Sequence, residues 1–103
     1  MFRLESLDFT TNYNDFKENV EILKNHVMFN EITINVEYVD FMNKVDREIV
    51  EITVCDDSYC VNVYDYTTKD VVIEDMYFER LTELVEYVGR MYFEEEFINE
   101  DEE

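Results

Sequence analysis

The two cysteines and the single histidine are the side chains best suited to redox, metal or nucleophilic chemistry in this sequence. Cys55 and Cys60 flank Asp57-Ser58, which predicts a hairpin with the two thiols facing each other at a separation that a disulfide allows. We expect free thiols, because a cytosolic protein is kept reduced. Zinc would need two further soft ligands, and His26 is distant, at the end of a predicted helix whose dipole suits an imidazolium. We therefore predict no metal site and no cofactor.

Carboxylates are the second group that could do chemistry, with 27 acidic residues against 8 basic ones. The calcium-binding EF-hand loop with its central glycine does not occur, and Asp56-Asp57 alone does not fill a calcium shell. A hydrolase with paired carboxylates would need a cleft that raises one pKa, which a two-layer domain of 103 residues seldom provides. No nucleophile lies in a recognisable motif near a base. These features predict that the chain is not an enzyme.

The formal net charge of −19 restricts the class of partner. DNA, RNA and acidic lipid surfaces bind proteins through Lys and Arg, so a basic partner is the natural complement to this chain. An apolar fraction of 47%, with 8 tyrosines and 8 phenylalanines, supplies a core, so the charge does not indicate disorder. The start of the chain lacks the apolar run of a signal peptide and no stretch reaches transmembrane length. We expect a cytoplasmic protein, in the host cell if a phage encodes it.

Residues 74–103 predict the element around which the rest is organised. Apolar residues spaced by three and four positions predict an amphipathic helix with Asp75 as its N-cap: Phe78, Leu81, Val85, Val88 and Tyr92. This stretch holds twelve acidic residues against two basic ones. Many of the carboxylates crowd the predicted C-terminal end, where the helix dipole favours Lys or Arg. The sequence therefore indicates that something other than folding maintains them.

The first part of the chain predicts a short strand at Phe2 and Leu4, followed by a helix. Asn12 is the expected cap, with Asp15 three residues later in a variant of the capping box. The helix is predicted over residues 13–27, and its apolar stripe consists of Phe16, Val20, Leu23 and Val27.

From Glu31 the apolar period changes to two, which predicts strands. The predicted hairpin at Asp57-Ser58 pairs Val54 with Val61, and an odd-length loop around residues 43–46 precedes it. The inward positions are Ile32, Ile34, Val36, Tyr38, Val50, Ile52, Val54, Tyr59, Val61 and Val63. The sheet then has three strands, or four if residues 71–73 join it.

These elements predict a two-layer α+β domain in the order β-α-β-β-β-α. Two helices pack on one face of an antiparallel sheet of three to four strands, because each helix and the sheet offer one apolar face. Residues 1–97 form the single acidic domain, and residues 98–103 are expected to fray into an acidic tail.

The predicted functional feature is the carboxylate surface, whose simpler explanation is solubility. Its charge has one sign, is concentrated in residues 74–103 and continues onto outward sheet positions and turns. Helical neighbours stand about 5–6 Å apart and alternate strand residues about 6.6 Å apart, comparable to phosphates along a nucleic-acid strand. We therefore favour mimicry of a polyanion. The predicted partner-binding residues are Glu37, Asp40, Glu51, Asp56, Asp57, Tyr64, Tyr66, Glu79, Glu83, Glu86, Glu94, Glu95, Glu96, Glu100 and Asp101.

The layout resembles phage-encoded DNA-mimic inhibitors. A small acidic domain with a helix, a three-stranded meander and an acidic C-terminal helix is most similar to type II anti-CRISPR proteins that occupy the DNA-binding groove of Cas9. The stretches that carry the resemblance are Glu86-Tyr87 and residues 92–97. The resemblance implies that the acidic residues stand in for the phosphates of the PAM region, bind the Cas9–guide RNA complex and block loading of target DNA.

Three alternatives remain. An anti-restriction protein or a uracil-DNA glycosylase inhibitor would use the same chemistry. An immunity or antitoxin-like protein would neutralise a cognate basic toxin and depend on aromatic anchors such as Tyr64, Tyr66 and Phe97. An assembly protein would pair its sheet edge with another copy of itself.

Overall fold

The computed structural model describes the backbone of residues 2–5, 8–25 and 29–101, together with their side chains apart from those of residues 2, 3 and 95–101. In this part of the chain the elements are, in order, strand β1 (Phe2–Glu5), helix α1 (Tyr13–Asn25), strands β2 (Phe29–Val39), β3 (Val45–Val54), β4 (Tyr59–Asp65) and β5 (Val71–Phe78), and helix α2 (Leu81–Asp101).

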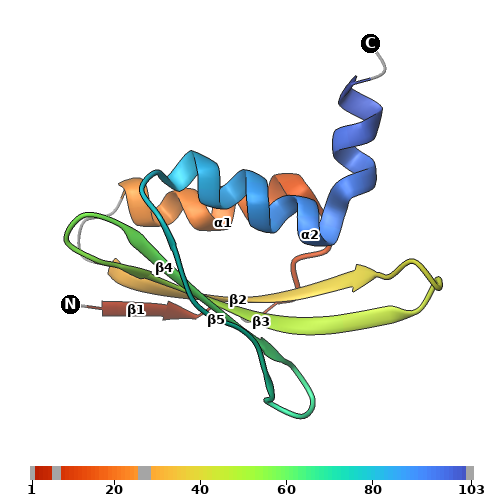
Figure 1. The fold of residues 1–103 in the computed structure, drawn as a ribbon, viewed down its shortest axis with the longest axis horizontal. Coiled ribbons are helices and arrows are strands. Elements are labelled where there is room, and N and C mark those ends of the chain that lie inside the picture. Colours follow the sequence, from red (N-terminus) through yellow and green to blue (C-terminus); the bar gives the residue numbers. More distant parts are fainter. Residues whose placement is uncertain (1, 6–7, 26–28, 102–103) are drawn as a thin grey trace.

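The strands form one sheet in the order β1-β2-β3-β4-β5, and both helices cover the same face of it (Figure 1). The predicted α+β architecture, with two helices on one side of a sheet, is confirmed. The sheet differs from the prediction because it has five strands and is mixed, with β1 parallel to β2. Alternation along a strand does not reveal the direction of its partner. Here α1 connects two neighbouring strands and returns the chain to the same end, which makes the pair parallel.

The core lies between the two helices and the inner face of the sheet. The inward positions predicted for β2 and β3 are confirmed, with Ile32, Ile34, Val36, Val50 and Ile52 fully buried. Burying such a side chain contributes about 1.5–3 kcal/mol. The helices cover them with a set of buried side chains: Phe16, Val20, Leu23, Leu81, Leu84, Val85 and Val88.

Helix α1 begins at the predicted cap. The side-chain oxygen of Asn12 accepts a hydrogen bond from the backbone N–H of Asp15 at 2.9 Å. In return, the side-chain amide of Asn12 donates to the Asp15 carboxylate at 3.0 Å. This reciprocal pair satisfies a backbone donor that the helix leaves free. Val27, the last residue predicted for the apolar stripe, lies outside the described residues.

The hairpin between β3 and β4 has a different register from the predicted one. Val54 pairs with Tyr59 and not with Val61, so the turn is centred on Asp56-Asp57 instead of Asp57-Ser58. The shift moves each partner by two residues, which leaves every side chain on its own face of the sheet. The alternation of apolar residues therefore could not distinguish the two registers.

The loop between β2 and β3 has the predicted odd length, with five residues at positions 40–44, slightly earlier than the expected 43–46. Its conformation is set by Asp40, whose carboxylate accepts hydrogen bonds from the backbone N–H groups of Met42 at 2.8 Å and Lys44 at 3.0 Å. Asp40 thus takes the local capping role that Asp commonly has in turns.

The prediction was wrong at the boundary between β5 and α2. The sequence predicts a strand at 71–73 and a helix from Asp75, whereas β5 continues to Phe78. Asp75 is not a helix cap but a strand residue with φ of 52°, at an irregularity in the pairing with β4. The irregularity allows both Ile73 and Met76 to pack against the core. Their separation of three residues also fits a helix, which is why the predicted helix begins before the observed one.

Helix α2 is bent. Phe93 has φ of −129° and ψ of 38°, which interrupts the helical backbone, and the segment after it turns away from the sheet (Figure 1). Helical backbone continues to Asp101, into the stretch 98–103 for which the sequence predicts a frayed tail. Within the described residues, every helix is too short or too polar to span a membrane.

Candidate partner-binding surface

The carboxylates of α2 fall into two groups, separated by the break at Phe93. Before the break, Glu83 and Glu86 are exposed, on the side of the helix opposite to the buried Leu84 and Val88. Glu83 lies in the first turn, where the positive end of the helix dipole favours a carboxylate. This half of α2 therefore carries Glu83 and Glu86 on the solvent side of the helical layer.

The break changes the electrostatic environment of Glu94, Glu95 and Glu96. The sequence predicts that they crowd an unfavourable helix C-terminus. Because Phe93 leaves the helical conformation, they instead begin a second helical segment, whose positive end favours carboxylates. The helix dipole therefore does not oppose carboxylates at these three positions. The positions that still oppose the dipole are 100–101, at the end of the described helix.

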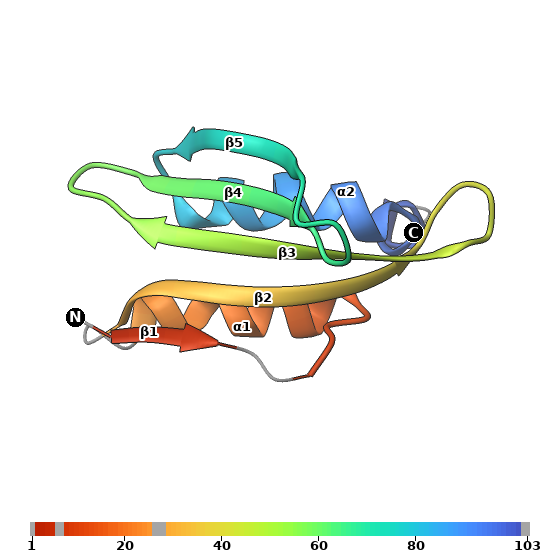
Figure 2. The same cartoon turned by 90° about the horizontal axis from the view of Figure 1, so that it is seen from below.

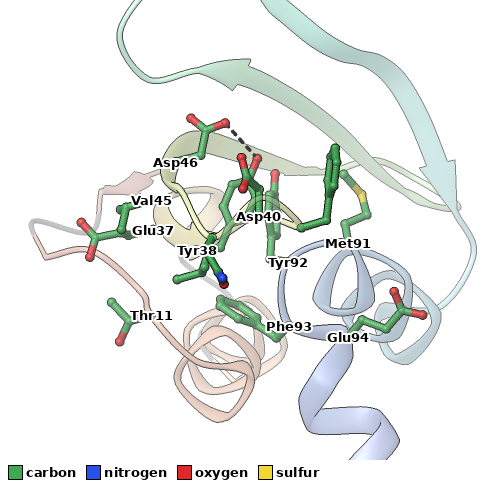
Figure 3. A pocket seen from close by; sticks show the side chains of 13 residues that line it. Thr11, Glu37, Tyr38, Asp40, Val45, Asp46, Met91, Tyr92, Phe93 and Glu94 are labelled. Carbon is green, nitrogen blue, oxygen red and sulfur yellow. Dashed lines mark hydrogen bonds between the residues drawn. The ribbon is translucent and has the colours of Figure 1, made fainter.

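A groove of about 910 Å³ lies between the β2–β3 hairpin and the bend of α2 (Figure 3). The hairpin contributes Asp40 and Asp46 to its lining, and the helix contributes Met91 and Glu94. Among the described residues that line it there is no Lys or Arg. The groove is therefore negative on both the hairpin side and the helix side.

The same groove has an apolar component. Phe41, at the tip of the hairpin, is 96% exposed, and Met91 on the helix is 38% exposed. Both line the groove together with the carboxylates. Apolar side chains next to charges of one sign are typical of surfaces that bind another protein, where anchors supply affinity and charge supplies orientation.

Two tyrosines in the groove lining also hold a buried carboxylate, that of Glu48. The hydroxyl of Tyr92 donates a hydrogen bond to it at 2.7 Å. The hydroxyl of Tyr38 lies 3.4 Å from the carboxylates of both Glu48 and Asp46, so these two acceptors share its single proton. Burial raises the pKa of Glu48 above its ordinary value; the hydrogen bond from Tyr92 opposes this rise, and the nearby charge of Asp46 adds to it. Glu48 is thus a structural carboxylate that anchors α2 to β3 next to the break.

Sequence reasoning missed Glu48, although the signal was present. Val50 and Ile52 point to the core, and Glu48 continues the same alternation two residues earlier. A carboxylate at an inward position needs hydrogen-bond donors, because burying an unpaired charge is costly. The strand pattern identifies the position, whereas the donors, Tyr38 and Tyr92, become its neighbours only in the folded chain.

A further part of the predicted surface lies on the outer face of the sheet, which neither helix covers (Figure 1): Glu37, Glu51, Tyr64 and Tyr66. The carboxylate of Glu37 pairs with Arg47 on the neighbouring strand at 2.9 Å. The Lys69 ammonium lies 4.5 Å from the centre of the Tyr66 ring. Because cations of the chain itself occupy this face, it is a weaker candidate for binding a basic partner.

The predicted turn carboxylates lie at opposite ends of the sheet (Figure 2). Asp40 is in the β2–β3 loop, and Asp56-Asp57 are exposed in the β3–β4 turn at the other end. Glu79 lies in the bend between β5 and α2 and not on a helix. From the predicted set, the groove brings together Asp40 and Glu94; Glu37 also borders it, but its carboxylate pairs with Arg47. The structure therefore distributes the predicted residues over several sides and does not join them in one surface.

Cys55 and Cys60 do not face each other as predicted, because the hairpin register differs. Cys60 pairs with Thr53, and Cys55 lies in the turn; both are free thiols. The sulfur of Cys60 is 3.8 Å from the carboxylate of Asp75, and burial raises the pKa of this thiol. Within the described residues no group of His, Cys, Asp and Glu is suited to hold a metal ion. His26 lies outside them.

Comparison with known proteins identifies no relative. No family model matches the chain, and neither the curated proteins nor the solved structures contain a match to it.

Proposed function

We propose that this chain is a non-catalytic inhibitor that presents carboxylates in place of nucleic-acid phosphates and occupies a basic DNA-binding groove of a partner protein. The observation that carries the proposal is the net charge of −19 on a folded domain. Between described side chains, ion pairs join Arg47 to Glu37 and Arg90 to Glu86. The second is an exposed pair within one helix turn, which neutralises little of the surface field.

Helix α2 provides the best location for such an array. Glu83 and Glu86 are exposed on successive turns, and helical neighbours of this kind stand about 5–6 Å apart. After the break at Phe93, α2 carries positions 94–101, of which 94, 95, 96, 100 and 101 are acidic, away from the body of the domain (Figure 1). A projecting acidic segment is accessible to a groove lined by Lys and Arg.

An anti-CRISPR protein that blocks loading of target DNA on the Cas9–guide RNA complex is the specific form of this proposal. Its support is the resemblance in layout and charge to small type II anti-CRISPR proteins. Inhibitors of restriction enzymes and of uracil-DNA glycosylase require the same surface chemistry and belong to the same proposal.

The test is competition with target DNA for a purified Cas9–guide RNA complex. The chain should displace labelled DNA, and displacement should weaken as the NaCl concentration rises, because long-range charge attraction is screened. The double variant Glu100→Lys, Asp101→Lys should weaken it further. The matched variant Asp70→Lys, Glu74→Lys changes the net charge equally at exposed carboxylates outside the predicted partner-binding set, and it should weaken competition clearly less.

Equal weakening by the two double variants would mean that the total charge determines competition and that the end of α2 is not a specific binding surface. If the chain displaces DNA from none of the three partner classes, namely Cas9–guide RNA, a restriction enzyme and uracil-DNA glycosylase, the proposed function is wrong.

A second candidate is an immunity or antitoxin-like protein that neutralises a cognate basic toxin. The exposed Phe41 favours it, because a mimic of phosphates needs no apolar anchor whereas protein interfaces commonly use one. For such a protein, Phe41→Ser should weaken binding to the toxin more than reversal of Glu100 and Asp101 does.

A further inference from the structure

The tip of the β2–β3 hairpin, residues 39–45, exposes a cluster of apolar side chains. Val39 is 59% exposed, Phe41 96%, Met42 59% and Val45 63%. Single exposed apolar residues are common on soluble proteins, but a contiguous group of them marks an interaction site or an aggregation hazard. The hairpin tip therefore requires an explanation that the net charge does not supply.

Hydrogen bonds hold the backbone of the loop that carries these side chains. The backbone N–H of Asp40 donates to the carbonyl of Lys44 at 2.9 Å, and that of Asn43 donates to the carbonyl of Asp40 at 3.0 Å. Asn43 has φ of 60°, a conformation that Asn tolerates. With the two bonds to the Asp40 carboxylate, this network limits the conformational entropy that binding through Phe41 would lose.

The surroundings of the hairpin tip define what can cover it. Across the groove α2 presents Met91 and Glu94, and the hairpin itself adds Asp40 and Asp46 (Figure 3). Lys44 of the loop is outside the groove lining, so within the groove a polynucleotide or an anionic membrane would meet like charge. A second copy of the chain also carries −19 and would be repelled. The complementary occupant combines apolar side chains with cations.

We infer that the hairpin tip and the adjoining groove dock a basic amphipathic segment of a partner protein. Its apolar side chains cover Phe41 and Met91, while its Lys and Arg side chains meet Asp40, Asp46 and Glu94. This inference rests on the proposed function only in taking the partner to be basic. It adds a requirement for apolar contact, which mimicry of phosphates does not have.

The inference is tested with the full chain and a fluorescent synthetic peptide of leucine and lysine that forms an amphipathic helix. A second peptide has the same composition with the leucines distributed around the helix, and a third is oligolysine of equal charge. Fluorescence anisotropy measures the dissociation constants. Amide chemical shifts of the isotope-labelled chain locate the binding site.

The amphipathic peptide should bind most tightly and should shift the amides of residues 39–46 and 91–94. Phe41→Ser should weaken its binding by more than about tenfold, and Glu94→Gln should weaken it less. Val72→Ser is the matched control, because Val72 is an exposed apolar residue on β5, outside the groove, and this variant should bind like the wild type. The amide spectra of the free variants report directly whether each is folded.

Equal affinity for the three peptides, or unchanged binding by Phe41→Ser, would overturn the inference. So would a dimer that forms without peptide and dissociates in Phe41→Ser, because the occupant would then be a second copy. This assay contains no DNA, so its outcome is independent of the competition test. Phe41-dependent peptide binding by a chain that displaces no DNA would support the docking site and reject the phosphate mimic.

Discussion

Glu48 is the residue whose chemistry departs most from that of a surface carboxylate. It is 9% exposed in a chain whose other described carboxylates lie mostly at the surface, and Tyr92 and Tyr38 donate hydrogen bonds to it. Hydrogen bonds to a charged group contribute about 1.5–3 kcal/mol each when well formed. The short bond from Tyr92 is therefore the one expected to matter, and it couples β3 to the bend of α2.

The raised pKa of Glu48 predicts how stability depends on pH. The folded state binds this proton more tightly than the unfolded state, whose carboxyl titrates near pH 4.3. The contribution of Glu48 to stability is thus fully present below about pH 4.3 and is lost as the pH rises through the higher folded pKa. Glu48→Gln removes the titration. The free energy of unfolding in urea should therefore fall less between about pH 4 and pH 7 in the variant than in the wild type.

Glu74→Gln provides the control for this experiment, because Glu74 is exposed on β5 and lies outside the helices. Its pH profile should follow that of the wild type. Parallel profiles for Glu48→Gln and the wild type would show that Glu48 is not the buried group described above.

The break in α2 explains why one helix can carry acidic residues along its length. Two dipoles replace one, so Glu83 and the residues 94–96 each lie near a positive end, and the positions 100–101 lie near a negative end. If the sequence formed one continuous helix, residues 94–96 would lie near the negative end of its dipole, which disfavours carboxylates. The non-helical backbone of Phe93 places them near a positive end instead.

This arrangement predicts opposite effects of charge reversal within α2. Glu94→Lys, Glu95→Lys and Glu96→Lys together should lower helicity, since each cation at a helix start costs about 0.3–1 kcal/mol. Glu100→Lys with Asp101→Lys should raise it. Far-UV circular dichroism at low ionic strength measures the difference. Both variants reduce the net negative charge, so relief of repulsion alone would change the helicity of both in the same direction. A change of the same sign in both variants would therefore reject the second dipole.

At the level of the whole molecule, the net charge of −19 opposes compaction. The core offsets this repulsion, with fully buried side chains on both helices and on the central strands of the sheet. Stability should consequently respond to anything that screens or neutralises the carboxylates.

Added NaCl should raise the melting temperature at pH 7, because the Debye length shortens from about 30 Å at 0.01 M to about 8 Å at 0.15 M. A gain of 1 kcal/mol corresponds to about 4–8 °C for a domain of this size. The rise should be smaller near pH 4.5, where many carboxylates bind protons. Calorimetry at both pH values measures it, and a melting temperature that does not respond to salt at pH 7 would contradict the role assigned to repulsion.

Much of the fold follows from local patterns. The period of two in β2 to β4 and the stripe of Phe16, Val20 and Leu23 identify the faces that form the core, and Asn12 with Asp15 marks the start of α1. Those patterns do not identify partners. Both registers of the β3–β4 hairpin place the same side chains on the inner face, and so do both directions of β1 relative to β2. Periodicity therefore could not distinguish between them.

The sequence alone determined the sign and size of the charge and the two-layer α+β class, because composition and periodicity are properties of the chain itself. The basic partner remains a proposal that rests on this charge. The tertiary structure decided which carboxylates share a surface, since neighbours in space come from distant elements. It joined Asp40 and Asp46 of the hairpin to Glu94 of the helix, paired Glu37 with Arg47, and buried Glu48 against Tyr92. The physical reason is that contacts between elements depend on register, bulges and one break in a helix, which short-range spacing does not encode.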